Sequence, residues 1–263
     1  MYIKNKIKIL ESKKDRQVIN FEDEYIIKKA QNRILFQESV FLHAYEENNF
    51  VENIIRFDSI NEYSIYEYIK GNNNYEIKDV GHMINQIIEF TKTYKNINIK
   101  EYGEVCALEQ SWYAFLKKEF DLKNKDMCYS EEKNNKVKKS LEIIKKYKID
   151  RKIIHGDLGI YNVICNSGNI IKVIDPRTII GDPIYDILSF IFSSSKIINN
   201  INIKSIIKNI QEPVEKIIAM MYIILYDRMA IEVKYNRNID DYEAVWNLID
   251  IIERGLWVLC KII

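Results

Sequence analysis

The segment from Ile153 to Leu188 constrains the fold more than any other part of the chain. It places polar residues between short apolar, β-branched runs. Asp157 and Asn162 stand five positions apart in one such loop, and Asp175 ends the next run. Two short strands would bring these three side chains together. Because Mg²⁺ prefers oxygen ligands and completes its shell with water and substrate phosphates, the sequence predicts a magnesium site for phosphate chemistry.

The hydrophobic pattern differs on the two sides of Gly71. Before it, alternating runs predict antiparallel strands between Tyr2 and Lys29, one helix over 32–48, and a hairpin that ends at the glycine. After it, the helical period dominates outside the polar segment. Helices are expected near 78–97, 104–121, 131–147, 183–195, 202–210, 213–235 and 239–261. The predicted fold class is α+β, with a small antiparallel sheet followed by a mainly helical part.

The polar segment also resembles a known family. His155-Gly156-Asp157, then Asn162, then an aspartate 13 residues later at Asp175, resemble the catalytic and metal loops of the protein-kinase-like fold. The continuation IDPRTIIGDPIYDI is similar to a signature of streptomycin and hydroxyurea phosphotransferases, within the aminoglycoside phosphotransferase and choline kinase-like family. This resemblance implies two lobes, residues 1–70 for nucleotide binding and 71–263 for catalysis and substrate binding.

The resemblance implies roles for the polar residues of this segment. Asp157 would accept or orient the proton of the substrate hydroxyl, and Asn162 and Asp175 would hold Mg²⁺. His155 would be a scaffold residue below the loop, and Asp186 would hydrogen-bond the loop backbone.

The expected role of Asp182 is structural and follows from its own position in the sequence. It precedes Pro183, a pair that is typical of a helix N-terminus, where a carboxylate caps free amides. We therefore expect Asp182 to support the structure.

On the nucleotide side, the resemblance implies a strand lysine for the phosphates and a helix glutamate, Glu38, that orients it. Lys28 shares its strand face with Ile26, whereas Lys29 points the other way. Lys28 is therefore the predicted phosphate lysine, with Lys29 as the alternative.

The segment that joins the lobes in this family would contact the purine. Its apolar and glycine pattern matches residues 66–71. The backbone of Glu67, Tyr68 and Ile69 is the part expected to bind the base.

Two positions allow more than one interpretation. The turn expected to cover the phosphates has no glycine, so backbone amides, Ser12, or the charges of Lys13, Lys14 and Arg16 are alternatives. Arg177 would contact a phosphate or substrate, or would pair with a carboxylate such as Asp182.

Composition restricts the partners. A formal net charge of +1 gives no field that would steer the protein to nucleic acid or an anionic membrane. The longest apolar run, Ile217 to Tyr226, is about half of the ~20 residues that a membrane span needs. Widely spaced cysteines and a charged N-terminus predict a cytoplasmic protein without disulfides. The oligomeric state is not predicted.

The predicted activity is transfer of the γ-phosphoryl group of ATP or GTP, with Mg²⁺, to a hydroxyl of a small molecule. An aminoglycoside-type antibiotic, and hence antibiotic resistance, is the first acceptor class that the resemblance implies. A metabolic kinase for choline, a sugar or another small alcohol is the alternative. A nucleotide-binding pseudokinase is disfavoured, because Asp157, Asn162 and Asp175 are all present.

Overall fold

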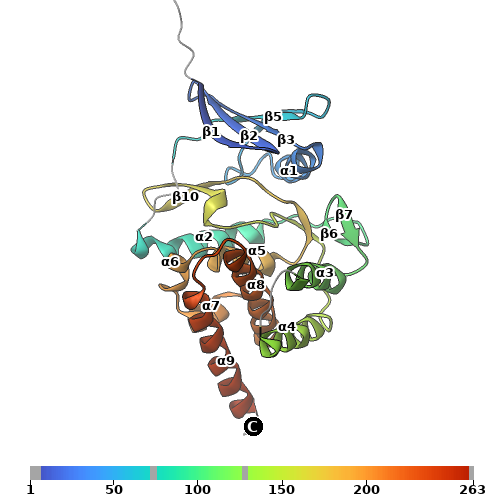
Figure 1. The fold of residues 1–263 in the computed structure, drawn as a ribbon, viewed down its shortest axis with the longest axis vertical. Coiled ribbons are helices and arrows are strands. Elements are labelled where there is room, and N and C mark those ends of the chain that lie inside the picture. Colours follow the sequence, from blue (N-terminus) through green and yellow to red (C-terminus); the bar gives the residue numbers. More distant parts are fainter. Residues whose placement is uncertain (1–6, 72–75, 126–129, 261–263) are drawn as a thin grey trace, which may run out of the picture.

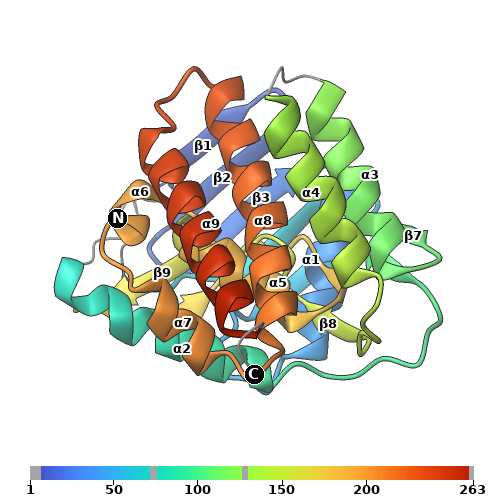
Figure 2. The same ribbon diagram turned by 90° about the horizontal axis from the view of Figure 1, so that it is seen from below.

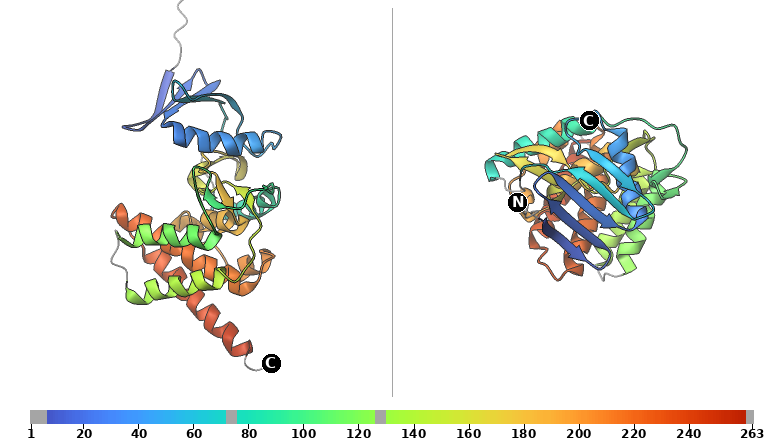
Figure 3. Two further views of the ribbon diagram at one scale, coloured as in Figure 1. Left: turned by 90° about the vertical axis from the view of Figure 1, so that its right-hand side faces the viewer. Right: turned by 90° about the horizontal axis from the view of Figure 1, so that it is seen from above.

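The structure is a computed structural model that describes residues 7–71, 76–125 and 130–260, without the side chains of residue 77 and of residues 256–260. A β-sheet with one helix forms one end of the molecule, and a bundle of helices forms the other (Figure 1). Short strands and the loops between them fill the layer between these ends (Figure 3). The predicted α+β class, a small antiparallel sheet followed by a mainly helical part, is therefore confirmed.

Five strands form the terminal sheet in the order β1-β2-β3-β5-β4, and all neighbours are antiparallel. Their bounds are β1 Ile7–Lys13, β2 Arg16–Phe21, β3 Tyr25–Ala30, β4 Ile54–Asp58 and β5 Tyr63–Glu67. Alternating apolar residues and short polar turns produce this meander. Lys28 lies on the central strand, opposite Val18 on one side and Ser64 on the other.

Helix α1 (Asn32–Ala44) lies between the sheet and the rest of the molecule (Figure 1). Its inner face buries apolar residues together with Glu38. The residue that follows it, Tyr45, donates a hydrogen bond to the Ile153 carbonyl at 2.6 Å and accepts one from the Lys95 amide at 2.7 Å. These bonds join the N-terminal part to the strand that leads into the Asp157 loop.

The helical part consists of eight α-helices within the described residues, and α8 lies between α4 and α9 (Figure 2). Residues 217–226 belong to α8 and are apolar on every side of the helix. A helix of this kind is a buried one, and these residues pack at the centre of the helical part. The helices are α2 Val80–Lys92, α3 Trp112–Lys125, α4 Glu131–Ile144, α5 Pro183–Ile191, α6 Ser195–Ile198, α7 Ile203–Asn209, α8 Val214–Lys234 and α9 Asp240–Cys260. Two 3-10 turns accompany them, η1 Ile77–Asp79 and η2 Ile160–Asn162.

The helix predicted for 104–121 is wrong in its first part. Residues 102–109 form a hairpin of β6 (Tyr102–Glu104) and β7 (Ala107–Glu109), and the helix begins only at Trp112. β6 pairs with β11 (Ile179–Gly181), a strand more than 70 positions away. Distant strand pairing thus overrides the local helical pattern.

The polar segment forms short strands that hold its loops: β8 Lys152–Ile154, β9 Val163–Asn166 and β10 Asn169–Val173. β9 and β10 form an antiparallel hairpin. β10 is also attached to the N-terminal part, because the Val173 amide donates to the Phe50 carbonyl at 2.8 Å and the Glu52 amide donates to the Val173 carbonyl at 3.2 Å. The loop that follows β10 is therefore fixed between the two parts of the molecule.

None of the described helices combines the length and the apolar composition that crossing a membrane requires.

Substitution of Gly156 tests whether the tight backbone turn before Asp157 requires a glycine. Its φ is +79°, and an added Cβ would lie 2.7 Å from Cγ1 of the fully buried Ile179. We expect Gly156→Ala to lower the free energy of unfolding by about 2 kcal/mol or more, measured by urea denaturation. Gly81→Ala is the control, because Gly81 lies in α2 with open space around it; it should be neutral or slightly stabilising. Equal effects of both changes would contradict this account.

Candidate active site

Lys28 is the most deeply enclosed charge of the site. Its side chain is 2% exposed, and its ammonium group contacts Glu38 from α1 and the Oδ1 atom of Asp175 at 2.5 Å. Tyr66 on β5 donates to the other Glu38 oxygen at 2.7 Å. Burial lowers the pKa of Lys28, but the two carboxylates outweigh it and raise that pKa. Lys28 is therefore charged and faces the loop of Asp175, whereas Lys29 is exposed.

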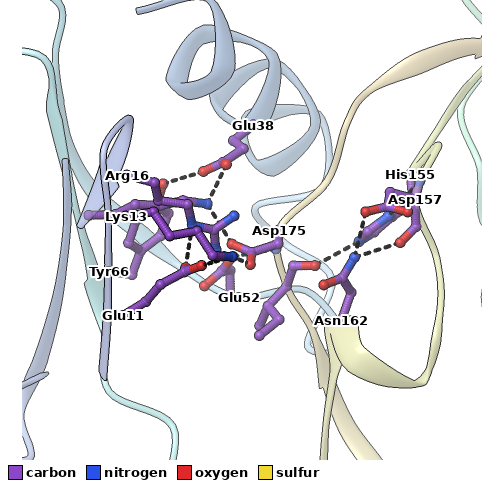
Figure 4. A network of polar contacts seen from close by, with 12 residues as sticks. Glu11, Lys13, Arg16, Glu38, Glu52, Tyr66, His155, Asp157, Asn162 and Asp175 are labelled. Carbon is purple, nitrogen blue, oxygen red and sulfur yellow. Dashed lines mark hydrogen bonds and ion pairs between the residues drawn. The ribbon is translucent and has the colours of Figure 1, made fainter. Parts of the chain in front are cut away.

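Asp175 lies where the two parts of the molecule meet. Its backbone has φ +57°, in the left-handed region that few residues other than glycine adopt. Lys28 contacts one carboxylate oxygen, and Arg16 from β2 contacts the other at 2.5 Å (Figure 4). Burial raises the pKa of Asp175, yet these two cations bring it down to about 2. Asp175 is thus an anion that holds two cations of the sheet.

Asp157 and Asn162 face each other across their loop. The Asn162 amide nitrogen donates to the Asp157 carbonyl at 2.7 Å and to its carboxylate at 3.0 Å. The side-chain oxygen of Asn162 therefore points away from Asp157, toward the side of Asp175 (Figure 4). The Asp157 side chain itself is exposed, so an incoming molecule can reach it.

His155 lies below this loop with both ring nitrogens occupied. Nε2 lies 2.9 Å from the Ile174 carbonyl, which only accepts, so Nε2 carries the proton and Nδ1 accepts from the Asp157 amide at 3.4 Å. Burial lowers the pKa of His155 to about 4, which keeps the ring neutral. Its edge also packs on Phe41 of α1. This geometry suits a scaffold residue and leaves no free nitrogen for chemistry.

Asp186 and Asp182 stabilise the site from the helical side. Asp186 on α5 accepts from the His155 and Gly156 amides at 2.7 and 2.9 Å and from the Tyr94 hydroxyl at 2.7 Å. Asp182 caps α5 by accepting from the Ile184 amide at 3.1 Å. The two aspartates therefore hold backbone rather than facing solvent.

Arg177 does not pair with Asp182. Its guanidinium binds Glu104 on β6 and Glu119 on α3 at 2.6 and 3.1 Å, whereas Asp182 pairs with Lys216 at 2.8 Å. The hairpin that the sequence pattern missed supplies Glu104, which is why the partner was not predicted.

The residues expected to contact the purine end β5 and lead to Gly71. The Glu67 amide donates to the Asn53 carbonyl at 3.3 Å, and the Tyr68 amide donates to the Glu24 carbonyl at 2.9 Å. These two donors are used by the sheet, so a base would have to use the carbonyl groups here or the amide of Ile69. Gly71 packs so closely on β9 that an added Cβ would lie 2.4 Å from Ile164.

The donor atoms suit Mg²⁺ rather than a metal caged by protein alone. Within residues 7–71, 76–125 and 130–260, no group of three or more His, Cys, Asp and Glu could enclose a metal. Mg²⁺ commonly uses one or two protein oxygens and takes the rest from water and phosphates. The Asp175 carboxylate and the side-chain oxygen of Asn162 form such a set.

Two residues of this site, Tyr66 and Glu52, were not assigned from the sequence, and Arg16 was one of several alternatives for the phosphates. Tyr66 orients Glu38, and Arg16 binds Asp175. Glu52 accepts from the Asp175 amide at 3.2 Å and is 8% exposed. Burial, and then the charge of Asp175, raises the pKa of Glu52 to about 8. Glu52 stands in a segment without a motif, so no sequence signal could have found it.

The charges that α3 and α8 carry near each other are mostly paired. Asp227 pairs with Lys123 at 3.0 Å, and Glu119 is held by Arg177. Arg228 has no ion pair within the described part of the chain, and its buried Nε has no hydrogen-bond partner. Although the Asp157 side chain is exposed, the protein atoms around it partly desolvate it and raise its pKa, and the charge of Arg228 opposes this rise.

Comparisons with known proteins identify the fold of the chain. No protein-family model matches the sequence, and no curated protein matches it. Among solved structures, a complex of a thermostable variant of aminoglycoside phosphotransferase APH(4)-Ia with ADP and hygromycin B superposes with a TM-score of 0.66 at 15% identity, covering 95% of this chain and 93% of that one. The chain has the fold of the aminoglycoside phosphotransferases.

Other solved structures share this kinase-like fold. The choline kinase LicA from Streptococcus pneumoniae gives a TM-score of 0.62 at 15% identity, with 93% of each chain covered. ADP-bound aminoglycoside phosphotransferase APH(2'')-Ib gives 0.56 at 18% identity, with 91% of each chain covered. The expected resemblance to aminoglycoside phosphotransferases and choline kinases is confirmed at the level of the fold.

Glu52 makes a pH-dependent contribution that a mutation can isolate. Its folded-state pKa of about 8 exceeds the unfolded value, so its contribution is full below about pH 4.3 and is lost as the pH rises through 8. Between pH 5 and pH 8 the wild type should lose roughly 4 kcal/mol of unfolding free energy relative to Glu52→Gln, at about 1.4 kcal/mol per pKa unit. Urea denaturation of both proteins measures this difference. Parallel pH profiles would disprove a buried, protonated Glu52.

Proposed function

We propose that the protein is a small-molecule O-phosphotransferase that moves the γ-phosphoryl group of ATP to an alcohol. The observation that carries this proposal is the spatial order of Lys28, Asp175, Asn162 and Asp157. A phosphate-binding cation and a metal-binding carboxylate lie on one side, and an exposed carboxylate for the acceptor hydroxyl lies on the other. Phosphoryl transfer needs these groups, because its rate comes from positioning and charge neutralisation.

In this proposal each residue has a defined role. Lys28, held by Glu38, contacts the donor phosphates, and the segment Glu67 to Ile69 takes the base. Asp175 and Asn162 hold Mg²⁺, which, when bound, neutralises charge on the phosphates. Asp157 orients the acceptor hydroxyl and receives its proton. His155, Asp182 and Asp186 keep the loop in place.

The assignment of two lobes follows from these roles. Residues 1–70 form the nucleotide-binding lobe, and residues 71–263 form the catalytic and substrate-binding lobe. Gly71 is a suitable boundary because it ends the segment after β5 and packs against β9. An adenine nucleotide is the favoured donor, since the similar structures are described with ADP or AMP-PNP.

An aminoglycoside is the first acceptor to test, because the IDPRTIIGDPIYDI segment carries that resemblance. One observation favours a second candidate, a choline-like alcohol, a sugar or another small alcohol that carries at most one positive charge. Asp227 and Glu119 are already paired with cations of this chain, and Arg228 adds a positive charge near Asp157. A polycation would have to displace or tolerate these charges.

The test is phosphate transfer from ATP with Mg²⁺ to streptomycin and other aminoglycosides, choline, sugars and amino alcohols. For the acceptor that is turned over, Asp157→Asn should lower kcat roughly 10²–10⁴-fold while ATP affinity stays near that of the wild type. Asp121→Asn is the matched control, because Asp121 is a half-exposed residue of α3 that pairs with Lys117. Full activity of Asp157→Asn would refute its role, and absence of ATP binding by the wild type would refute the proposal.

A further inference from the structure

We propose that Arg16 binds the phosphate tail of the donor nucleotide and takes the place of a glycine-rich phosphate loop. The inference rests on the proposed function, and it names a residue for which the motifs give no role. The turn between β1 and β2 has no glycine but has three cations, Lys13, Lys14 and Arg16. The structure distinguishes one of them from the other two.

Arg16 is the cation of this turn that reaches the site. Its Nη2 lies 2.5 Å from Asp175 Oδ2, on the same carboxylate that Lys28 contacts. Its side chain is 30% exposed, compared with 75% for Lys13, and Lys14 is exposed as well. Among the three, Arg16 is therefore positioned beside the group that receives the phosphates.

A second contact aims Arg16 at the site. Its Nε lies 2.8 Å from the Glu11 carboxylate on β1, and Lys13 contacts the other oxygen of Glu11. The guanidinium thus spans from Glu11 on β1 to Asp175 (Figure 4). A planar guanidinium matches phosphate oxygens with two parallel hydrogen bonds.

When the nucleotide binds, Arg16 exchanges its contact with Asp175 for a contact with the phosphates. The surroundings of Asp175 explain this exchange. Each of its oxygens already faces a cation, so a metal ion bound there would be repelled by both. Lys28 is buried and held by Glu38, whereas Arg16 is partly exposed and held from one strand. Arg16 is the partner that can turn away, and the phosphates arriving with the metal offer it a new anion.

The test compares nucleotide affinities of purified wild type, Arg16→Ala, Arg16→Lys and Lys14→Ala by isothermal titration calorimetry with ATP, ADP and adenosine, each with Mg²⁺. Arg16→Ala should weaken ATP binding about 10- to 100-fold, as for loss of a charged hydrogen bond, while adenosine binding changes less than twofold. Arg16→Lys should recover part of the ATP affinity. Lys14→Ala should bind ATP like the wild type. Thermal unfolding of each variant confirms that it is folded.

Two results would overturn the inference while leaving the proposed function intact. Unchanged ATP affinity in Arg16→Ala would mean that Arg16 only neutralises Asp175. Tighter ATP binding in that variant would mean that Arg16 obstructs the site and makes no contact with the phosphates. Failure of the wild type to bind ATP would instead overturn the proposed function and this inference together.

Discussion

The buried contact of Lys28 with Glu38 and Asp175 is the interaction on which the site depends. It joins three elements that are distant in the sequence: strand β3, helix α1 and the loop after β10. A buried charge is costly unless it is paired, and loss of one partner leaves the other uncompensated. The sheet, the helix and the Asp175 loop must therefore adopt their relative positions together, which fixes the donor side of the site.

A second set of contacts fixes the loop of Asp157 relative to the loop of Asp175. Asp186 fixes the backbone before Asp157, and the ring of His155 connects that backbone to the Ile174 carbonyl, one residue before Asp175. A neutral, buried imidazole thus links the loop of Asp157 to the loop of Asp175 by hydrogen bonds. Preorganisation of this kind is how a phosphotransferase gains rate without a covalent intermediate.

Much of this arrangement follows from the sequence, because its signals are local. Alternation along β3 implies that only one of Lys28 and Lys29 faces the site, and the structure places Lys28 there. The spacing of Asp157 and Asn162 fits one short loop. The strands of residues 102–109 could not be predicted, since they depend on pairing with β11 far along the chain. The same hairpin supplies Glu104 to Arg177. Arg16 could not be separated from Lys13 and Lys14 because only tertiary contacts with Glu11 and Asp175 distinguish them.

The most direct measurement is a crystal structure of the wild-type protein with AMP-PNP and Mg²⁺. The account predicts the triphosphate beside Lys28, a metal ion bound by Asp175 and Asn162, and the base against the segment Glu67 to Ile69. The γ-phosphate should face the exposed carboxylate of Asp157. A nucleotide bound elsewhere, or a triphosphate that contacts neither Lys28 nor a metal on Asp175, would contradict the account.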